Sequence, residues 1–152
     1  MSLYLLSIHK GERYLIPTAD VIEVAPYVKP REISGAPDYI VGMIDYRGET
    51  LPLVDICFLL SGTPCKVVLC SRILIGKINS PDGEVVTVGW LFDGVTETLR
   101  IDEAQFKEPP LHLEGVPYLG DVATDEKGIM QRMVVQQILP EEAYAILFAR
   151  AD

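Results

Sequence analysis

The side chains that could perform catalysis or bind a metal do not fall into a known pattern in this sequence. The two histidines, His9 and His112, have no cysteine or aspartate at the spacing of a catalytic or metal motif. The three cysteines are spaced Cys57-x7-Cys65-x4-Cys70, which matches no zinc-binding pattern. There is no glycine-rich phosphate loop, no dinucleotide-binding fingerprint, and no pair of carboxylates whose apolar neighbours would separate an acid from a base. We therefore expect a protein that is not an enzyme and that uses no metal or cofactor.

Binding chemistry is instead concentrated in one short segment, residues 42–55. Two apolar runs, 39–44 and 51–54, flank a polar stretch with the sequence Asp45-Tyr46-Arg47-Gly48. Apolar runs joined by a short link that contains glycine predict a β-hairpin, because glycine permits the positive φ that tight turns need. Pro52 has no N–H for a strand ladder, so we expect the second strand to lie at a sheet edge or to contain a bulge.

Arg47 is the strongest candidate for a binding residue. On this hairpin, Asp45, Tyr46 and Arg47 would face solvent on a rigid support. A guanidinium offers five donors in a fixed geometry for carboxylates and carbonyls, and arginine and aromatic residues are enriched at binding hot spots. The alternative is a turn arginine that contacts only water. Asp45 is also close enough in sequence to pair with Arg47 and occupy its donors.

Composition indicates one globular domain, residues 1–152, that does not bind nucleic acid or membranes. Apolar residues make up 49% of the chain, which is ample for a core. The net charge of −9 opposes binding to a phosphate backbone or to an anionic bilayer. Neither a secretory signal nor an apolar run of about 18–20 residues is visible, so we expect a cytoplasmic protein without membrane insertion. In that compartment the three cysteines would be buried, reduced thiols.

The order of apolar and turn residues predicts an all-β fold with short helices. Asp55 and Gly62 fit the start and end of a helix at 56–60, and a second helix would begin at Pro140. The strand at 66–75 would be bent near Ser71, and alternate positions from 86 to 92 would share one face of another strand. About nine or ten short strands predict a β-barrel or sandwich. Besides the hairpin, we expect strands at 4–8, 13–16, 22–24, 66–75, 86–92, 95–101, 118–123 and 129–135.

The hairpin segment resembles the signature of CheW-like adaptor domains. The family pattern is glycine, two apolar residues and Asn-Leu-Arg-Gly, followed by apolar-Pro-apolar-apolar-Asp-Leu. This chain has Gly42-Met43-Ile44-Asp45-Tyr46-Arg47-Gly48 and then Leu51-Pro52-Leu53-Val54-Asp55-Ile56, so Asp45 replaces the asparagine and Tyr46 the leucine. Shorter segments at 14–24, 91–95 and 119–123 resemble other family elements in the same order. The resemblance implies two intertwined five-stranded SH3-like β-barrels that share a core, with a groove between them.

The resemblance also implies two binding surfaces. One would bind the cytoplasmic tip of a methyl-accepting chemoreceptor, and its residues would be Val21, Glu23, Gly42, Asp45, Tyr46, Arg47 and Gly48. The other would bind the regulatory domain of a CheA-type histidine kinase and would include Val67 and Val68. A buried position in a core strand suits Val67 and Val68 at least as well.

The function that the resemblance implies is a cytoplasmic adaptor that couples such receptors to the kinase in a chemotaxis-type array. Two alternatives stay open. The adaptor could serve a non-flagellar chemosensory pathway, such as surface sensing or pilus motility, which the departures at Asp45 and Tyr46 fit. The chain could also be a small β-barrel that binds a metabolite in the groove between the barrels.

Overall fold

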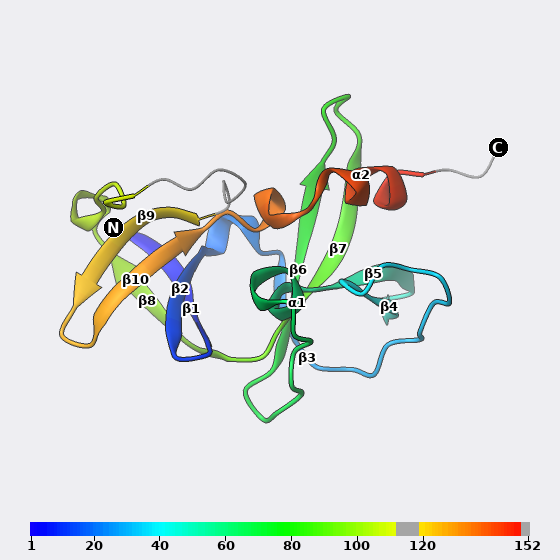
Figure 1. Ribbon diagram of the computed structural model, residues 1–152, viewed down its shortest axis with the longest axis horizontal. Coiled ribbons are helices and arrows are strands. Elements are labelled where there is room, and N and C mark those ends of the chain that lie inside the picture. Colours follow the sequence, from blue (N-terminus) through cyan, green and yellow to red (C-terminus); the bar gives the residue numbers. More distant parts are fainter. Residues whose placement is uncertain (112–118, 150–152) are drawn as a thin grey trace.

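The structure of the protein is a computed structural model that describes residues 1–111 and 119–149 (Figure 1). His112, one of the two histidines considered above, lies outside these residues, as does the first residue of the strand expected at 118–123. Within the described ranges, no helix has the length and apolar character needed to cross a membrane.

Short strands are the main regular elements of the described chain. They are β1 (Ser2–His9), β2 (Glu12–Pro17), β3 (Glu23–Pro26), β4 (Ile40–Tyr46), β5 (Glu49–Asp55), β6 (Arg72–Asn79), β7 (Val85–Phe92), β8 (Val95–Ile101), β9 (Leu119–Asp125) and β10 (Gly128–Met133). The short helices are η1 (Thr18–Asp20), α1 (Ile56–Ser61), η2 (Glu103–Gln105), η3 (Val135–Ile138) and α2 (Glu141–Leu147).

The strands form two curled five-stranded sheets with the same pattern of pairing. The first sheet has the order β8-β1-β2-β10-β9, and the second has the order β3-β6-β7-β5-β4. In each sheet the third and fourth strands are parallel, β2 with β10 and β7 with β5, and the other neighbours are antiparallel. The chain begins in the first sheet, builds the second, and returns to the first at β8. This arrangement confirms the predicted all-β fold with two intertwined five-stranded units.

The two sheets share one core. Leu5 and Ile16 from the first sheet pack in the same buried cluster as Leu74 and Trp90 from the second. The last segment of the chain leaves the first sheet and runs beside the second as η3 and α2 (Figure 1), and Ala143 of α2 is buried in that central cluster. Each sheet also encloses a smaller apolar cluster of its own. Because burial of apolar surface is the main stabilising contribution, the shared cluster makes the two sheets depend on each other.

Several local predictions are confirmed. Asp55 caps α1, since its Oδ1 accepts a hydrogen bond from the Phe58 N–H at 3.0 Å, and Gly62 ends the helix with a φ of 76°. Pro140 directly precedes α2. The alternate positions from 86 to 92 on β7 all contribute to the central cluster.

The second hairpin strand was predicted to lie at a sheet edge or to contain a bulge because of Pro52. The edge position is found for Pro52 itself but not for the strand as a whole. The strand β5 is an interior strand, with β4 on one side and β7 on the other. Its pairing with β7 begins at Leu53, so Pro52 pairs with Met43 of β4 alone. The missing N–H therefore costs no ladder hydrogen bond on the β7 side.

The predicted strand at 66–75 is wrong in its first half, because β6 begins at Arg72 and runs to Asn79. Residues 62–71, which we call the 62–71 loop, contain no strand. Ser71 explains the difference: its Oγ accepts from the Val68 N–H at 2.9 Å, and its own N–H donates to the Val68 carbonyl at 3.0 Å. Such short-range bonds from a serine side chain compete with pairing in a sheet.

The prediction of three buried, reduced cysteines is also wrong. Cys57 and Cys65 form a disulfide with a Cα–Cα distance of 5.0 Å. Cys70 is free and exposed. The predicted extended strand would have carried Cys65 away from α1, whereas the 62–71 loop folds back and brings it to Cys57.

Candidate protein-interaction site

The predicted hairpin is formed by β4 and β5, and its tip is a two-residue turn. Tyr46 pairs with Glu49, so only Arg47 and Gly48 lie between the strands. Both have a positive φ, 51° at Arg47 and 82° at Gly48, as in turns whose twist matches that of a hairpin. A left-handed conformation costs a residue with a Cβ about 1–2 kcal/mol, so the contacts of the tip must hold Arg47 in place.

Asp45 closes this turn. Its Oδ1 accepts a hydrogen bond from the Gly48 N–H at 3.0 Å. The possible pairing of Asp45 with Arg47 does not occur, because the carboxylate accepts from the backbone of the turn. Arg47 forms its ion pair with Glu23 instead.

Glu23 on β3 contacts both other side chains of the tip. Arg47 Nη2 donates to Glu23 Oε1 at 3.0 Å, and the Tyr46 hydroxyl donates to Oε2. The Arg47 guanidinium also lies 5.4 Å from the centroid of the Tyr46 ring. Since β3 and β4 are the two opposite edges of the second sheet, these side-chain contacts close the curled sheet.

The contacts of Glu23 also set the charge of the tip. The hydrogen bond from Tyr46, and then the charge of Arg47, hold the pKa of Glu23 below its ordinary value of 4.5. The same hydrogen bond to the carboxylate raises the pKa of Tyr46 above its ordinary value of 10.0. At neutral pH, Glu23 is therefore ionised and Tyr46 neutral. Together with Arg47, the three groups form a cluster without net charge on a strongly acidic protein.

Gly42, a predicted receptor-binding residue, has a structural role. A Cβ at this position would lie 2.2 Å from the Arg31 carbonyl oxygen, which no rearrangement of a flexible side chain could relieve. The close approach arises because Arg31 and Met43 exchange two backbone hydrogen bonds, at 2.8 and 2.9 Å. Gly42 thus allows residues 27–38 to pack against β4.

The apolar residues around Glu23 differ in their exposure. Val21 is half-buried and packs against the central cluster. Ile22 and Val24 are 54% and 41% exposed, although both are apolar. Ile22 also lines a hollow of about 300 Å³ with Trp90 and Gln136, in the predicted groove between the two sheets. The strand expected at 22–24 is present as β3, which begins at Glu23. Its charged side chain is the less exposed one, because Glu23 contacts Tyr46 and Arg47 at the opposite edge of the same sheet.

The second predicted surface lies in the 62–71 loop. Val67, Val68 and Leu69 are 52%, 54% and 92% exposed. The alternative position for Val67 and Val68, in a buried core strand, is therefore wrong. Leu69 was missed because the segment was predicted to be a strand. The structure brings together Glu23 and the hairpin tip, and it places Val67 and Val68 in a different loop.

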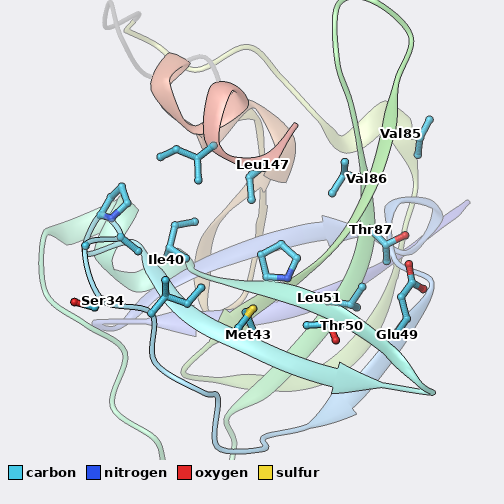
Figure 2. Close-up of a pocket in the computed structure, with 16 residues that line it drawn as sticks. Ser34, Ile40, Met43, Glu49, Thr50, Leu51, Val85, Val86, Thr87 and Leu147 are labelled. Carbon is cyan, nitrogen blue, oxygen red and sulfur yellow. The ribbon is translucent and has the colours of Figure 1, made fainter. Parts of the chain in front are cut away.

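An apolar hollow of about 650 Å³ lies on the second sheet, beside β4, β5, the start of β7 and α2 (Figure 2). Figure 2 shows Ser34 at one end of this hollow and Glu49 and Thr87 at the other. A site for a metabolite needs a few polar groups that converge on one point, and these do not converge. The hollow is also built on one sheet, whereas the metabolite site was expected between the two barrels.

Two clusters of possible metal ligands among the described residues were missed by sequence spacing, and both include Cys57; the second consists of Asp55, Cys57 and Cys65. His9, Cys57 and Asp93 have ligand atoms within 4.8 Å of one another, although they come from β1, α1 and the corner after β7. His9 Nδ1 lies 2.8 Å from Asp93 Oδ2, and His9 Nε2 lies 3.2 Å from Ser61 Oγ. The sulfur of Cys57 is bonded to Cys65, so neither cluster offers a thiolate to a metal in this state.

Comparisons with known proteins match this chain to one family along most of its length. The family model described as CheW-like domain matches residues 4–143. The "Chemotaxis protein CheW" of Bacillus subtilis (strain 168) is 26% identical over 116 residues, which are 76% of this chain and 69% of that protein. "Protein FrzA" of Myxococcus xanthus is 29% identical over 108 residues, which are 66% of this chain and 64% of that protein.

A solved structure shows the same fold. The scaffolding protein TtCheW from Thermoanaerobacter tengcongensis matches with a TM-score of 0.77 and 22% sequence identity. The match covers 91% of this chain and 88% of that one. The arrangement of two five-stranded sheets is therefore shared.

Proposed function

This chain belongs to the CheW-like domain family, and we propose that it is a single-domain cytoplasmic adaptor without catalytic activity of its own. It would couple the tips of methyl-accepting receptors to the regulatory domain of a CheA-type histidine kinase. The observation that supports this proposal best is the geometry of Arg47. The signature arginine of the family is 74% exposed here, yet the ion pair with Glu23 holds it in one place. An exposed but fixed guanidinium is suited to binding a protein partner.

The receptor surface would combine this tip with the apolar side chains beside it. Val24 and Ile22 flank Glu23, and Ile22 continues into the groove between the sheets. An apolar strip next to a fixed arginine fits a helix that buries apolar residues and presents carboxylates or carbonyl oxygens to the guanidinium. The ion pair between Glu23 and Arg47 adds no net charge to this surface, and Asp45 contributes one exposed negative charge beside it.

The kinase surface would be the 62–71 loop. Val67, Val68 and Leu69 are adjacent apolar residues that are each at least half exposed. Exposed apolar groups of this kind favour a protein partner. Two separate surfaces would allow the receptor and the kinase to bind together, so that the receptor's conformation biases the kinase.

Binding measurements with single-site variants test this proposal. We expect the wild type to bind both a kinase regulatory domain and a receptor-tip fragment. Arg47→Ala should lose about 2 kcal/mol of receptor binding, roughly 30-fold in Kd, and keep its affinity for the kinase. Arg100→Ala is the matched control, because Arg100 is an exposed arginine on β8 of the other sheet. A wild type that binds neither partner would overturn the adaptor function.

The pathway that this adaptor serves remains a prediction. A non-flagellar array stays the alternative, and the departures at Asp45 and Tyr46 support it. In the structure Asp45 adds an exposed charge and Tyr46 contacts Glu23, so both residues alter the surface that a receptor would meet.

A further inference from the structure

We propose that Cys57 and Cys65 are a redox modification site, which exchanges with low-molecular-weight thiols and disulfides and thereby controls the 62–71 loop. The inference rests on the proposed function only for its consequence on kinase binding. The pair itself is argued from the contacts of the two sulfur atoms.

The disulfide ties an exposed loop to the core. Cys57 is in α1 and is 1% exposed, whereas Cys65 lies half-buried in a loop without strand or helix. Most neighbours of Cys65 in the loop are exposed. The bridge is therefore a covalent link between a rigid element and the segment that presents Val67, Val68 and Leu69.

The unequal burial of the two sulfurs determines where exchange occurs. Cys65 is partly exposed and Cys57 is only 1% exposed, so an incoming thiolate attacks the Cys65 side of the bond. Attack at Cys65 makes Cys57 the leaving thiolate. Exchange rates depend on access to the attacked sulfur, which favours Cys65 as the entry point.

The site also has partners for the reduced form. The sulfur of Cys65 lies 3.5 Å from the Leu91 carbonyl oxygen. This oxygen can accept a hydrogen bond from a thiol but not from a disulfide, which has no S–H. The N–H of Cys65 donates to Asp55 Oδ2 at 3.0 Å, a bond that does not involve the sulfur. Reduction therefore loosens the loop without leaving a buried polar group unpaired.

The oxidation step uses a low-molecular-weight disulfide, RSSR, as the oxidant. The thiolate of Cys65 attacks one sulfur of RSSR, which forms a mixed disulfide and releases one RS⁻. Cys57 then attacks Sγ of Cys65, forms the intramolecular bond and releases the second RS⁻, and the two RS⁻ take up the two protons lost by the protein. Two electrons pass from the protein dithiol to RSSR, and an excess of RSH reverses the reaction. Disulfides in cytosolic proteins are usually of this transient, sensing kind.

The first experiment uses the full chain and glutathione as the probe. The protein is equilibrated at a series of ratios of reduced to oxidised glutathione and alkylated, and its free cysteines are identified by mass spectrometry. We expect Cys57 and Cys65 to lose their thiols together, with a mass change of two hydrogens and no bound glutathione. Thiols that both stay reactive at the highest share of oxidised glutathione, or a stable glutathione adduct at Cys65, would overturn the proposal.

The second readout is hydrogen exchange of the amides in residues 62–71, which needs no partner. We expect exchange roughly tenfold faster in the reduced protein, because the covalent link to α1 is gone. Cys65→Ser should exchange at the reduced rate under all conditions, while Cys70→Ser, in the same loop but outside the bridge, should respond as the wild type does. Equal exchange in the two redox states would overturn control of the loop.

Kinase binding separates this inference from the proposed function. The oxidised form should bind the kinase regulatory domain about fivefold more tightly, since its loop is preorganised. Equal kinase affinity in both states would contradict the regulatory consequence. A pair that titrates and changes loop exchange, in a protein that binds no kinase domain, would contradict the proposed function and support the redox site.

Discussion

Glu23 and Arg47 form an ion pair across the two opposite edges of one sheet, with 3.0 Å between Oε1 and Nη2. The two residues are 24 positions apart in the sequence. The pair fixes the hairpin tip relative to β3, where the exposed side chains of Ile22 and Val24 flank Glu23. The elements of the proposed receptor surface are thus held together by side chains and not by strand pairing.

Glu23→Gln should weaken receptor binding while leaving Tm nearly unchanged. The amide can still accept the Tyr46 hydrogen bond, but it loses the charge that holds Arg47, and exposed ion pairs contribute little to folding. We expect receptor binding roughly threefold to tenfold weaker, measured as Kd for a receptor-tip fragment. Glu49→Gln is the matched control, because it removes a carboxylate beside the turn that is not paired with Arg47. Equal receptor affinity in Glu23→Gln and wild type would show that the ion pair does not position Arg47.

The contact between Glu23 and Tyr46 should depend on pH at both ends of the scale. Because the folded protein lowers the pKa of Glu23, the contribution of its ionised form is present above pH 4.5 and is lost as the pH falls through the lowered pKa. Because the pKa of Tyr46 is raised, the contribution of its neutral form is present below pH 10.0 and is lost as the pH rises through the raised pKa. Titration of both side chains by NMR measures these limits. Glu23→Gln should return the pKa of Tyr46 toward 10.0, and a Tyr46 pKa that does not move would contradict the contact.

Asp45→Asn should change partner preference and not the fold. Asparagine keeps an Oδ1 that can accept from the Gly48 N–H, so the turn remains closed and only the charge is removed. If the natural receptor offers a basic or polar group to Asp45, its binding should weaken, while binding to receptors without that group should strengthen. The measurement is competition between two receptor-tip fragments that differ in charge. An unchanged preference between the two receptor-tip fragments would show that Asp45 does not select the partner.

Gly42→Ala should destabilise the protein by about 2–4 kcal/mol, because a new Cβ would overlap the Arg31 carbonyl. Gly83→Ala is a useful control. Its φ is also positive, at 86°, but a Cβ there would meet no atom within 4 Å, so we expect a loss of only about 1–2 kcal/mol. Chemical denaturation of both variants measures the difference. A similar loss in the two variants would mean that backbone conformation, and not the contact with Arg31, requires glycine at position 42.

The features that depend only on residues close together in the sequence were predicted correctly. The hairpin, the cap of α1 by Asp55 and the buried face of β7 depend on spacing within a few residues, and all were predicted. The partner of Arg47 was not, because Glu23 reaches it only after the sheet has curled to bring its edges together. The sequence around Glu23 indicated a strand. It could not show that the Glu23 side chain would point toward β4, the opposite edge of the second sheet.

The 62–71 loop shows a second limit of structure prediction from the sequence. Its apolar residues have strand propensity, but the hydrogen bonds of Ser71 to the backbone of Val68 and Lys66 favour a turn over a ladder. The N–H of Cys65 donates to Asp55 Oδ2, which holds the start of the loop beside α1 and Cys65 beside Cys57. A spacing rule for cysteines could not find the pair, because the bridge depends on the path of the loop.

Val68→Asp separates the surface role of this loop from the core-strand alternative. Because Val68 is 54% exposed, the aspartate stays in water, and we expect the free energy of unfolding to change by no more than about 0.5 kcal/mol. The same change at Val88, which is fully buried in the central cluster, should cost several kcal/mol or prevent folding, since it buries a charge without a partner. Denaturation curves of the two variants measure this contrast. On the proposed function, Val68→Asp should also lose affinity for the kinase regulatory domain while keeping that for the receptor tip. A folded Val68→Asp protein with wild-type kinase affinity would remove this loop from the kinase surface.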